Sequence, residues 1–443
     1  MNARRRNKMG SFARLFAATV ALAASVAVAN DATLEAERRV TLEADRCATL
    51  YHSYEFEDIK DTPAPGGLVP FYISHYGRHG SRHLLEADDK EVLARLEKEN
   101  GKGNLAPAGI RLLDAMRRLA AQHDDMYGEL ALRGATEHET LARRMAERFP
   151  QVFAGDGKSV VCQGSRIARC NVSMAAFVST LSRVFPRISF TFLVGRRYHS
   201  ILVYRPSGWK ENDRPRMGKL MRKTLRSEFD SKRFLSSIFV KPPRIKDPAL
   251  FVLKVFDCAS IAQCLDRELD GLSFMDVFTS DERTTLARCR SIEYYAALGG
   301  SLEFGDTVLA SAKPVVADIL KRADAAVAGR GVAADLRFAH DSGLWPIAPF
   351  LKLAGPGDRI PATETFERCP VWKYCPMAAN LQIVLYRTPA PNDVPDAPPD
   401  PSKVLVKILW NEKETAVRGL TPVAGPYYAW SDFRAGVEKA LAE

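Results

Sequence analysis

Residues 68–74, LVPFYIS, run directly into residues 76–82, YGRHGSR, and this junction decides the fold. The first stretch is apolar and aromatic, and it follows a Pro/Gly-rich turn signal at 62–67, so it predicts a buried strand. The second stretch has the composition of a strand end that enters a tight turn and then a helix. Because α/β sheets bind ligands at such turns, the junction predicts both a sheet and the position of its site.

Strand and helix patterns alternate on both sides of this junction and again near the end of the chain. Strands are predicted over 159–162, 189–194, 336–339, 381–386 and 404–410, and helices over 89–99, 106–123, 136–149 and 174–185. The middle of the chain has helical patterns and few strand signals. We therefore expect an α/β domain formed by 30–204 and 327–443, with an inserted, mainly α-helical domain at 205–326.

The composition is that of a globular protein, because 46% of the 443 residues are hydrophobic and 26% are charged. Disordered, collagen-like and multi-span membrane proteins are excluded on this ground, and no segment after residue 29 is expected to cross a membrane. The formal net charge of +10 falls by half once the first 29 residues are set aside, so a nucleic-acid partner is not expected.

The first 29 residues resemble a secretory signal peptide. Five cations precede an apolar run at 15–28, which ends in Ala27-Val28-Ala29, and the pattern predicts cleavage before Asn30. An uncleaved signal anchor is the alternative. Either one predicts export, so we expect a periplasmic or secreted protein without stable membrane insertion after cleavage.

In an exported protein the eight cysteines are expected to form disulfides. The short spacings favour pairing Cys369 with Cys375 and Cys258 with Cys264. Cys162 and Cys170 are a third candidate pair, which leaves Cys47 and Cys289. The pairings themselves do not follow from the sequence.

His79 lies between Arg78 and Arg82 at the predicted turn. Two nearby guanidinium groups favour the neutral imidazole, which is a nucleophile, and their planar N–H groups match phosphate oxygens. Gly80 would let the backbone approach an anion, and the following helix would add its N-terminal N–H groups. This arrangement predicts a phosphoryl-transfer site in which His79 is phosphorylated. A solvated basic turn without function is the simpler alternative.

His340 and Asp341 repeat this layout, because they follow the strand predicted at 336–339 and precede a helical segment near 344. A phosphohistidine mechanism needs an acid for the leaving alkoxide and then a base for water, and Asp341 suits both roles. His340 would contact the phosphoryl oxygens. The alternative is that Asp341 only caps a helix.

Together these motifs resemble the histidine acid phosphatase family. Further segments resemble its multiple inositol polyphosphate phosphatase branch: Gly128-Glu129-Leu130 with Gly134, Ala142-Arg143-Arg144-Met145, Glu147-Arg148-Phe149-Pro150, Arg169-Cys170 with Ser173 and Phe177, 377–382, and Gly425-Pro426-Tyr427-Tyr428. The resemblance runs from about residue 68 to the C-terminus and is thin at 205–268. It implies a histidine-phosphatase-like central sheet flanked by helices, with an inserted α-helical domain.

The resemblance also implies roles for individual residues. His79 would be the nucleophile and Asp341 the proton donor, while Arg78, Arg82, Arg169 and His340 would bind the substrate phosphate. Arg169 is assigned by resemblance, because Arg166 lies only three residues away. No metal and no cofactor are expected.

The chain departs from the branch at three places. It has His340-Asp341-Ser342 where the branch usually has His-Ala-Glu, so the donor resembles that of the wider family of histidine acid phosphatases and phytases. His83 replaces a proline or an aromatic residue, and Ala131 replaces a threonine. Both positions are expected at the substrate mouth or just behind it.

Segment 201–250 contains 13 Lys or Arg residues and 5 Asp or Glu residues, which favours a substrate with several phosphates. We therefore expect an exported phosphomonoesterase for phytate and other inositol polyphosphates. The alternatives are a histidine acid phosphatase of broad specificity and, from a different class, a non-catalytic module that binds polyanions. A solvated basic helix face would explain the charge equally well.

Overall fold

A computed structural model describes residues 43–206, 214–390 and 397–443. The predicted signal peptide at 1–29 lies outside the described residues. Residues 47–443 form one compact unit, and the following concerns this unit.

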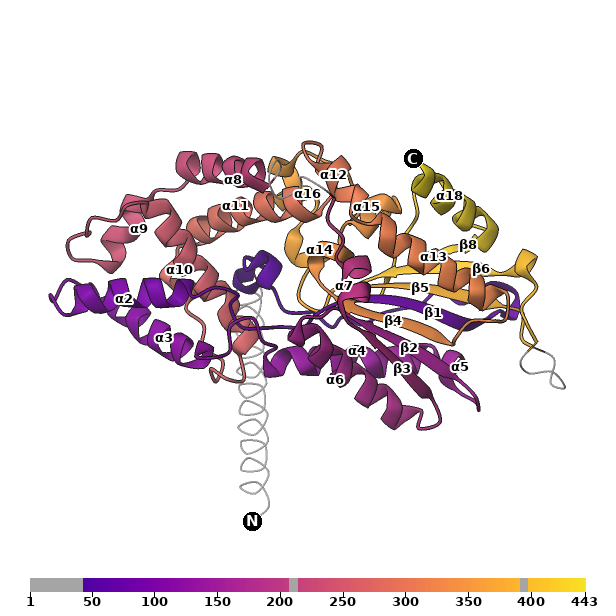
Figure 1. Ribbon diagram of the computed structural model, residues 1–443. Helices are drawn as coiled ribbons and strands as arrows, with labels where there is room; N and C mark the ends of the chain where they lie inside the picture. The colour runs from indigo at the N-terminus through magenta and orange to yellow at the C-terminus, as the bar shows by residue number, and fades with distance from the viewer. Residues whose placement is uncertain (1–42, 207–213, 391–396) are drawn as a thin grey trace, which may run out of the picture. The chain divides into compact units, whose positions relative to one another are not determined.

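A central sheet runs through the unit in the order β3-β2-β4-β1-β5-β6-β7, and β8 pairs with β6 (Figure 1). The first four strands in this order are parallel, while β5 and β6 run antiparallel to their neighbours. The strands are β1 (Val69–Arg78), β2 (Ser159–Gly164), β3 (Ser189–Val194), β4 (Ala334–Ala339), β5 (Asn380–Arg387), β6 (Leu405–Trp410), β7 (Lys413–Glu414) and β8 (Tyr427–Ala429). The six predicted strands are present, each within a few residues of its expected bounds.

Helices cover both faces of the sheet, because alternate side chains of each strand point to opposite sides. On one face, Tyr72 and Tyr76 of β1 join a core with α13 (Lys313–Val327) and α18 (Trp430–Ala442). On the other face, Ile73 joins a core with α4 (Leu132–Arg148) and α6 (Ala168–Val184). The predicted α/β class is therefore confirmed (Figure 1).

The described residues of the predicted insert, 205–326, contain helices and no strand. The domain boundaries stay predictions. Three helices pack with the other part of the chain than these boundaries assign them to. Helix α13 lies within them but packs on the sheet, while α2 and α3 precede them but contact α9 and α10. The helices of this helical part are α2 (Asp88–Asn100), α3 (Pro107–His123), α8 (Arg214–Glu228), α9 (Ser231–Ile238), α10 (Pro248–Ala262) and α11 (Ser280–Leu298).

Shorter helices connect these parts of the unit. They are α5 (Pro150–Phe153), α7 (Arg196–Leu202), α12 (Gly305–Ala310), α14 (Asp341–Leu344), α15 (Ile347–Phe350), α16 (Thr365–Arg368), α17 (Val371–Tyr374) and the 3₁₀ turns η1 (Thr49–Tyr51), η2 (Pro65–Gly67), η4 (Gln263–Leu265), η5 (Met275–Val277), η6 (Ala362–Glu364) and η7 (Pro401–Lys403).

The segment Pro248–Leu265 is long and apolar enough to cross a membrane by length and composition, which corrects the expectation that no such segment follows the signal. In the structure 78% of it is buried inside the unit, so its apolar side chains pack against protein. Its composition is explained by the core of the helical part.

Candidate active site

The two predicted motifs meet because β1 and β4 are parallel neighbours in the sheet. Arg78 pairs with Ala339 at the carboxyl ends of the two strands, and the His79 N–H donates to the Ala339 carbonyl at 3.0 Å. The rings of His79 and His340 lie 5.5 Å apart between centroids. Residues more than 250 positions apart in the chain therefore share one site at the edge where α/β sheets bind ligands.

The His79 ring is held in one orientation and one tautomer. Its Nδ1 lies 2.9 Å from the Gly80 carbonyl, which can only accept, so Nδ1 carries the proton and Nε2 carries the lone pair. Burial, followed by the charges of Arg169 and Arg78, holds the pKa of His79 well below its usual value. The imidazole is therefore neutral and can act as a nucleophile through Nε2.

Arg78 is fully buried and is fixed at the end of β1. Its Nη1 donates to the carbonyls of Leu50 and Cys375, both at 2.9 Å, and its Nη2 lies 3.1 Å from an Asp341 carboxylate oxygen. Its Nε has no hydrogen-bond partner among the described residues. The guanidinium thus links the nucleophile strand to the carboxylate.

Arg82 and Arg169 are held through backbone carbonyls. Arg82 Nη1 donates to the His83 carbonyl at 2.7 Å, and Arg169 Nη1 donates to the Gly128 carbonyl at 3.1 Å. Burial and then the charge of Arg82 lower the pKa of Arg169. Among the described residues neither forms an ion pair with a carboxylate, so both remain available to an anion. Arg166, the other candidate on this segment, is exposed.

His340 closes the other side of the site. Its Nε2 lies 3.1 Å from the Ser165 hydroxyl and 3.5 Å from the Cys170 sulfur. Burial, followed by the charge of Arg169, lowers the pKa of His340 to about 3. The second imidazole is therefore neutral as well.

Asp341 is the first residue of α14, and one of its carboxylate oxygens accepts from the Ser342 N–H at 2.6 Å. The Ser342 and Arg78 contacts coexist, since they use different oxygens, and the N-cap of α14 is His340, so the alternative that Asp341 only caps a helix is wrong. Burial raises the pKa of Asp341, but Arg78, His340 and Arg82 together lower it below its usual value. The carboxylate is therefore ionised while no anion occupies the site.

Glycine and buried polar groups shape the turn at 79–82. A Cβ on Gly80 would lie 2.4 Å from the Gly134 carbonyl oxygen, so the turn and α4 are in backbone contact. The Gly80 N–H donates to Ser173 and the Ser81 N–H to the buried Glu137 carboxylate. The helix predicted over 89–99 is present as α2, but the expectation that its N-terminal N–H groups join the turn is wrong. Helix α2 begins only at Asp88, and the N–H groups of 80 and 81 are already used by these side chains.

His83 and Ala131 lie just behind the turn. The His83 ring packs against His123 at 5.3 Å between centroids, and burial lowers its pKa to about 4. The Ala131 N–H donates to the Ser81 carbonyl at 2.9 Å. Their contacts support the turn; the expected role at the substrate mouth stays a prediction.

Three residues next to the site carried no signal in the sequence. Leu50 accepts from Arg78, and the Tyr51 ring lies 5.3 Å below the Arg82 guanidinium. Arg205 donates to the Ser342 carbonyl at 2.8 Å and places another cation near Asp341. None belongs to a recognisable motif, and only the folded chain brings them to the site.

The structure contains none of the disulfides expected from the cysteine spacings. The Cys170 thiol donates to the Ala339 carbonyl, the Cys264 thiol to Tyr51 and the Cys369 thiol to Gly355. Spacing along the chain does not determine where the side chains point. These thiols face backbone carbonyls, so the pairings Cys162–Cys170, Cys258–Cys264 and Cys369–Cys375 are not formed.

The sequence is similar to part of a known protein. Over 116 residues the chain is 33% identical to multiple inositol polyphosphate phosphatase 1 of Gallus gallus; the match spans 26% of this chain and 24% of that relative. The chain thus matches about a quarter of the curated relative's length. No family model matches the sequence.

Solved structures match over nearly the whole chain. Multiple inositol polyphosphate phosphatase of Bifidobacterium longum, in complex with phosphate, has a TM-score of 0.74 at 20% identity and covers 90% of this chain and 97% of its own. The same enzyme with inositol hexasulfate has a TM-score of 0.71 at 20% identity, with 88% and 97% covered. The phytase from D. castellii has a TM-score of 0.62 at 15% identity, with 90% and 85% covered.

These matches establish the class of fold, an α/β sheet flanked by helices as in histidine acid phosphatases. More particularly, the chain has the fold of the multiple inositol polyphosphate phosphatases and phytases. The resemblance inferred from the sequence is confirmed.

Proposed function

We propose that this protein is a phosphomonoesterase that hydrolyses inositol polyphosphates, including phytate, through a phosphohistidine intermediate at His79. One observation carries the proposal: a neutral imidazole with a free Nε2 lies among Arg78, Arg82, Arg169 and His340, beside a carboxylate. The site offers an anion several positive N–H donors and offers its phosphorus a nucleophile.

In the first step the Nε2 lone pair of His79 attacks phosphorus, and an N–P bond forms as the ester P–O bond breaks. Asp341 gives its proton to the leaving alkoxide. In the second step Asp341 accepts a proton from water, the water oxygen attacks phosphorus and the N–P bond breaks. Inorganic phosphate leaves, and His79 regains its lone pair. The arginines and His340 stabilise the equatorial oxygens in both steps.

Asp341 must hold a proton before the first step, although the charges of Arg78 and Arg82 lower its pKa. A bound phosphate places negative charge on the same cations and so weakens their effect on the carboxylate. We therefore expect the pKa of Asp341 to rise when substrate binds, and the reaction to be faster at acidic than at alkaline pH.

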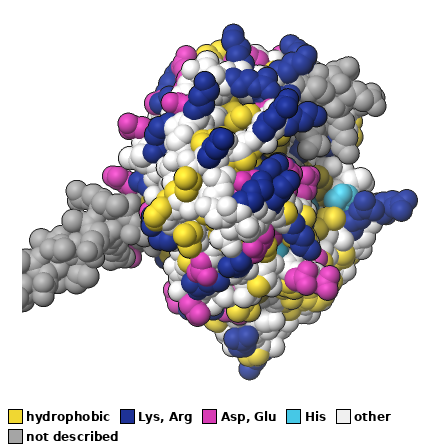
Figure 2. All heavy atoms as spheres, turned by 90° about the vertical axis from the view of Figure 1, so that its left-hand side faces the viewer, with side chains coloured by type: hydrophobic (Ala, Val, Ile, Leu, Met, Phe, Trp, Pro, Cys, Tyr) yellow, Lys and Arg dark blue, Asp and Glu magenta, His cyan; other side chains and the backbone are white. Residues whose placement is uncertain are grey.

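Two observations favour a substrate with several phosphates. Helix α8 exposes Lys219, Arg222 and Lys223, and many Lys and Arg side chains gather on the face of the molecule drawn in Figure 2. A relative of this fold was solved with inositol hexasulfate, a polyanion.

The signal-like N-terminus supports export to the periplasm or the medium. Mapping the mature N-terminus of the protein made in cells tests this, with Asn30 as the expected first residue.

The decisive experiment measures phosphate release from phytate and from an aryl phosphate by the purified protein between acidic and neutral pH. His79→Ala is expected to lower kcat by at least about 1,000-fold with the fold intact, because the nucleophile is lost. Asp341→Asn is expected to lower kcat on phytate more than on an aryl phosphate, whose better leaving group needs less protonation.

Asp156→Asn is the matched control, since Asp156 is exposed and, among the described residues, forms its ion pair with the exposed Arg187. A His79→Ala protein with the wild-type rate would exclude the phosphohistidine mechanism. Activity on the aryl phosphate alone would favour the broad-specificity phosphatase, and inactivity on both substrates would favour a polyanion-binding module.

A further inference from the structure

The turn η1, in the segment before β1, contacts two of the three arginines of the site. The Leu50 carbonyl accepts from Arg78 Nη1 at 2.9 Å, and the Tyr51 ring lies 5.3 Å from Arg82 Cζ. Both contacts reach guanidinium groups whose positions decide how a phosphate is bound.

Arg82 is held in place without a carboxylate partner among the described residues. It is 4% exposed and lies near other cations, yet its fixed contacts within the described chain are only the His83 carbonyl and the Tyr51 ring. A carboxylate would hold it but would also neutralise it and occupy its N–H groups. An aromatic face attracts the cation and leaves these N–H groups to the phosphate.

Tyr51 is itself fixed from the helical part of the unit. Its carbonyl accepts from the Cys264 thiol at 3.2 Å, and its hydroxyl lies close enough to Tyr294 of α11 to interact with it. The next residues continue the attachment, because the Ser53 N–H donates to Gln263 at 3.1 Å. Burial raises the pKa of Tyr51, so the phenol stays neutral. The ring is therefore held rigidly against Arg82.

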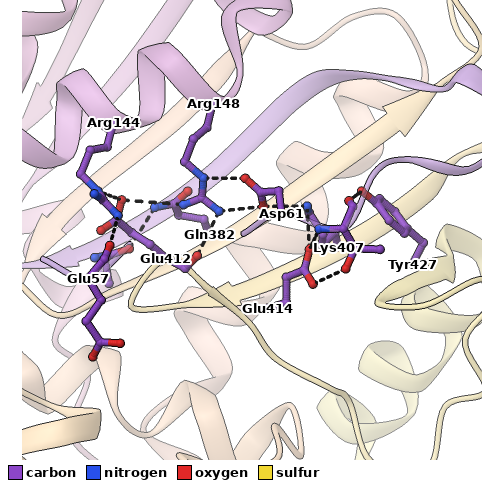
Figure 3. Close-up of polar contacts among 11 residues, drawn as sticks. Glu57, Asp61, Arg144, Arg148, Gln382, Lys407, Glu412, Glu414 and Tyr427 are labelled. Carbon is purple, nitrogen blue, oxygen red and sulfur yellow. Dashed lines mark hydrogen bonds and ion pairs between the residues drawn. The ribbon is translucent and has the colours of Figure 1, made fainter. Parts of the chain in front are cut away.

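The chain after η1 is anchored at a second place. Asp61 accepts two hydrogen bonds from Arg148, both at 2.9 Å, and one from Lys407 at 3.0 Å, as Figure 3 shows. Tyr54 lies between the two anchors, and its N–H donates to Glu137 at 3.1 Å. The segment 49–61 is thus attached to the phosphate site at one end and to the sheet at the other.

We propose that Tyr51 is a positioning residue of the phosphate site: its aromatic face holds the Arg82 guanidinium in place while leaving its N–H groups free for the substrate. The inference rests on the proposed function and adds a residue outside every motif. It assigns the segment before β1 a role in positioning the phosphate-binding side chains.

The test compares Tyr51→Leu and Tyr51→Phe with wild type in kcat and KM on an aryl phosphate and in binding of inorganic phosphate measured by calorimetry. Leucine removes the aromatic face, so kcat/KM and phosphate affinity should both fall by about tenfold. Phenylalanine keeps the face and should stay within about threefold of wild type.

Phe56→Leu is the matched control, because Phe56 lies in the same segment and makes the same kind of contact, at 5.8 Å, with Arg144, away from the site. It should leave kinetics and phosphate binding unchanged. If Tyr51→Leu unfolds, Tyr51→Met, which also lacks a ring, takes its place.

A Tyr51→Leu protein with wild-type phosphate affinity would overturn the inference. Equal losses of phosphate affinity in the leucine and phenylalanine variants would also overturn it, because the hydroxyl and not the aromatic ring would then be required. The calorimetric arm separates this outcome from failure of the proposed function. A wild-type protein that binds phosphate but does not turn over still reports on Tyr51.

Discussion

Two regions of this molecule hold buried or half-buried cations in opposite ways. In the ion-pair network, formed by Asp61, Arg144, Arg148, Lys407, Glu412 and Glu414, each cation meets a carboxylate within 3.1 Å (Figure 3). In the phosphate site Arg82 and Arg169 meet none among the described residues, and Arg78 meets only Asp341. A buried cation without a counter-charge costs stability. The difference is what we expect if the network stabilises the fold and the proposed phosphate site binds an anion.

Arg169→Ala tests the proposed phosphate site, where Arg82 and Arg169 have no carboxylate partner among the described residues. Because one phosphate donor is lost, kcat/KM should fall by about 100- to 1,000-fold, while stability stays level or rises as repulsion with Arg82 disappears. Steady-state kinetics and chemical denaturation measure the two effects. Arg187→Ala, an exposed cation, is the control. Unchanged kinetics in Arg169→Ala would remove Arg169 from the site.

Arg148→Ala should give the reverse result. Asp61 and the buried Glu412 lose a partner, so the free energy of unfolding should fall by about 2 kcal/mol. The folded fraction should keep the wild-type kcat. Denaturant titration with parallel kinetics checks both, and a large loss of kcat at full folding would contradict the division between the two regions.

Inorganic phosphate should stabilise the proposed phosphate site and leave the ion-pair network unaffected. At about 100 times its Kd it should stabilise the wild-type protein by about 2.7 kcal/mol. The same gain is expected in Arg148→Ala and a smaller one in Arg169→Ala. Thermal melts at constant ionic strength with phosphate or chloride measure this, and equal gains in all three proteins would indicate binding elsewhere.

Buried neutral histidines should make the fold sensitive to acid. Burial lowers the pKa of His75 to about 3, so folding favours its neutral form. This stability is complete above pH 6.5 and falls by about 1 kcal/mol per pH unit as pH drops toward 3. His75 lies among Phe177 and Phe338, so His75→Leu should fold and lose stability less steeply below pH 6.5. Parallel pH profiles for the two proteins would contradict this.

The sequence predicted the strands that carry the site well, because each pattern is local. The segment 189–194 has its observed bounds, and the strand expected at 68–74 is present as β1, although it extends to Arg78, so that the turn begins at His79. The helix predicted over 89–99 is present, but the expectation that its N-terminal N–H groups join the turn was wrong, since α2 begins only at Asp88. Cysteine spacing also failed, because it carries no information about side-chain direction.

By itself, the sequence determined the reactive residue types and their positions at strand ends: Arg78 and His79 after one strand, His340 and Asp341 after another. Alternating apolar residues and turn formers act over a few positions, so they can be interpreted without the fold. The tertiary structure alone decided that β1 and β4 are neighbours, which tautomer His79 adopts, and that Tyr51 supports Arg82. These depend on contacts between distant segments, whose pairing is set by packing of the whole core and has no signature in any local pattern.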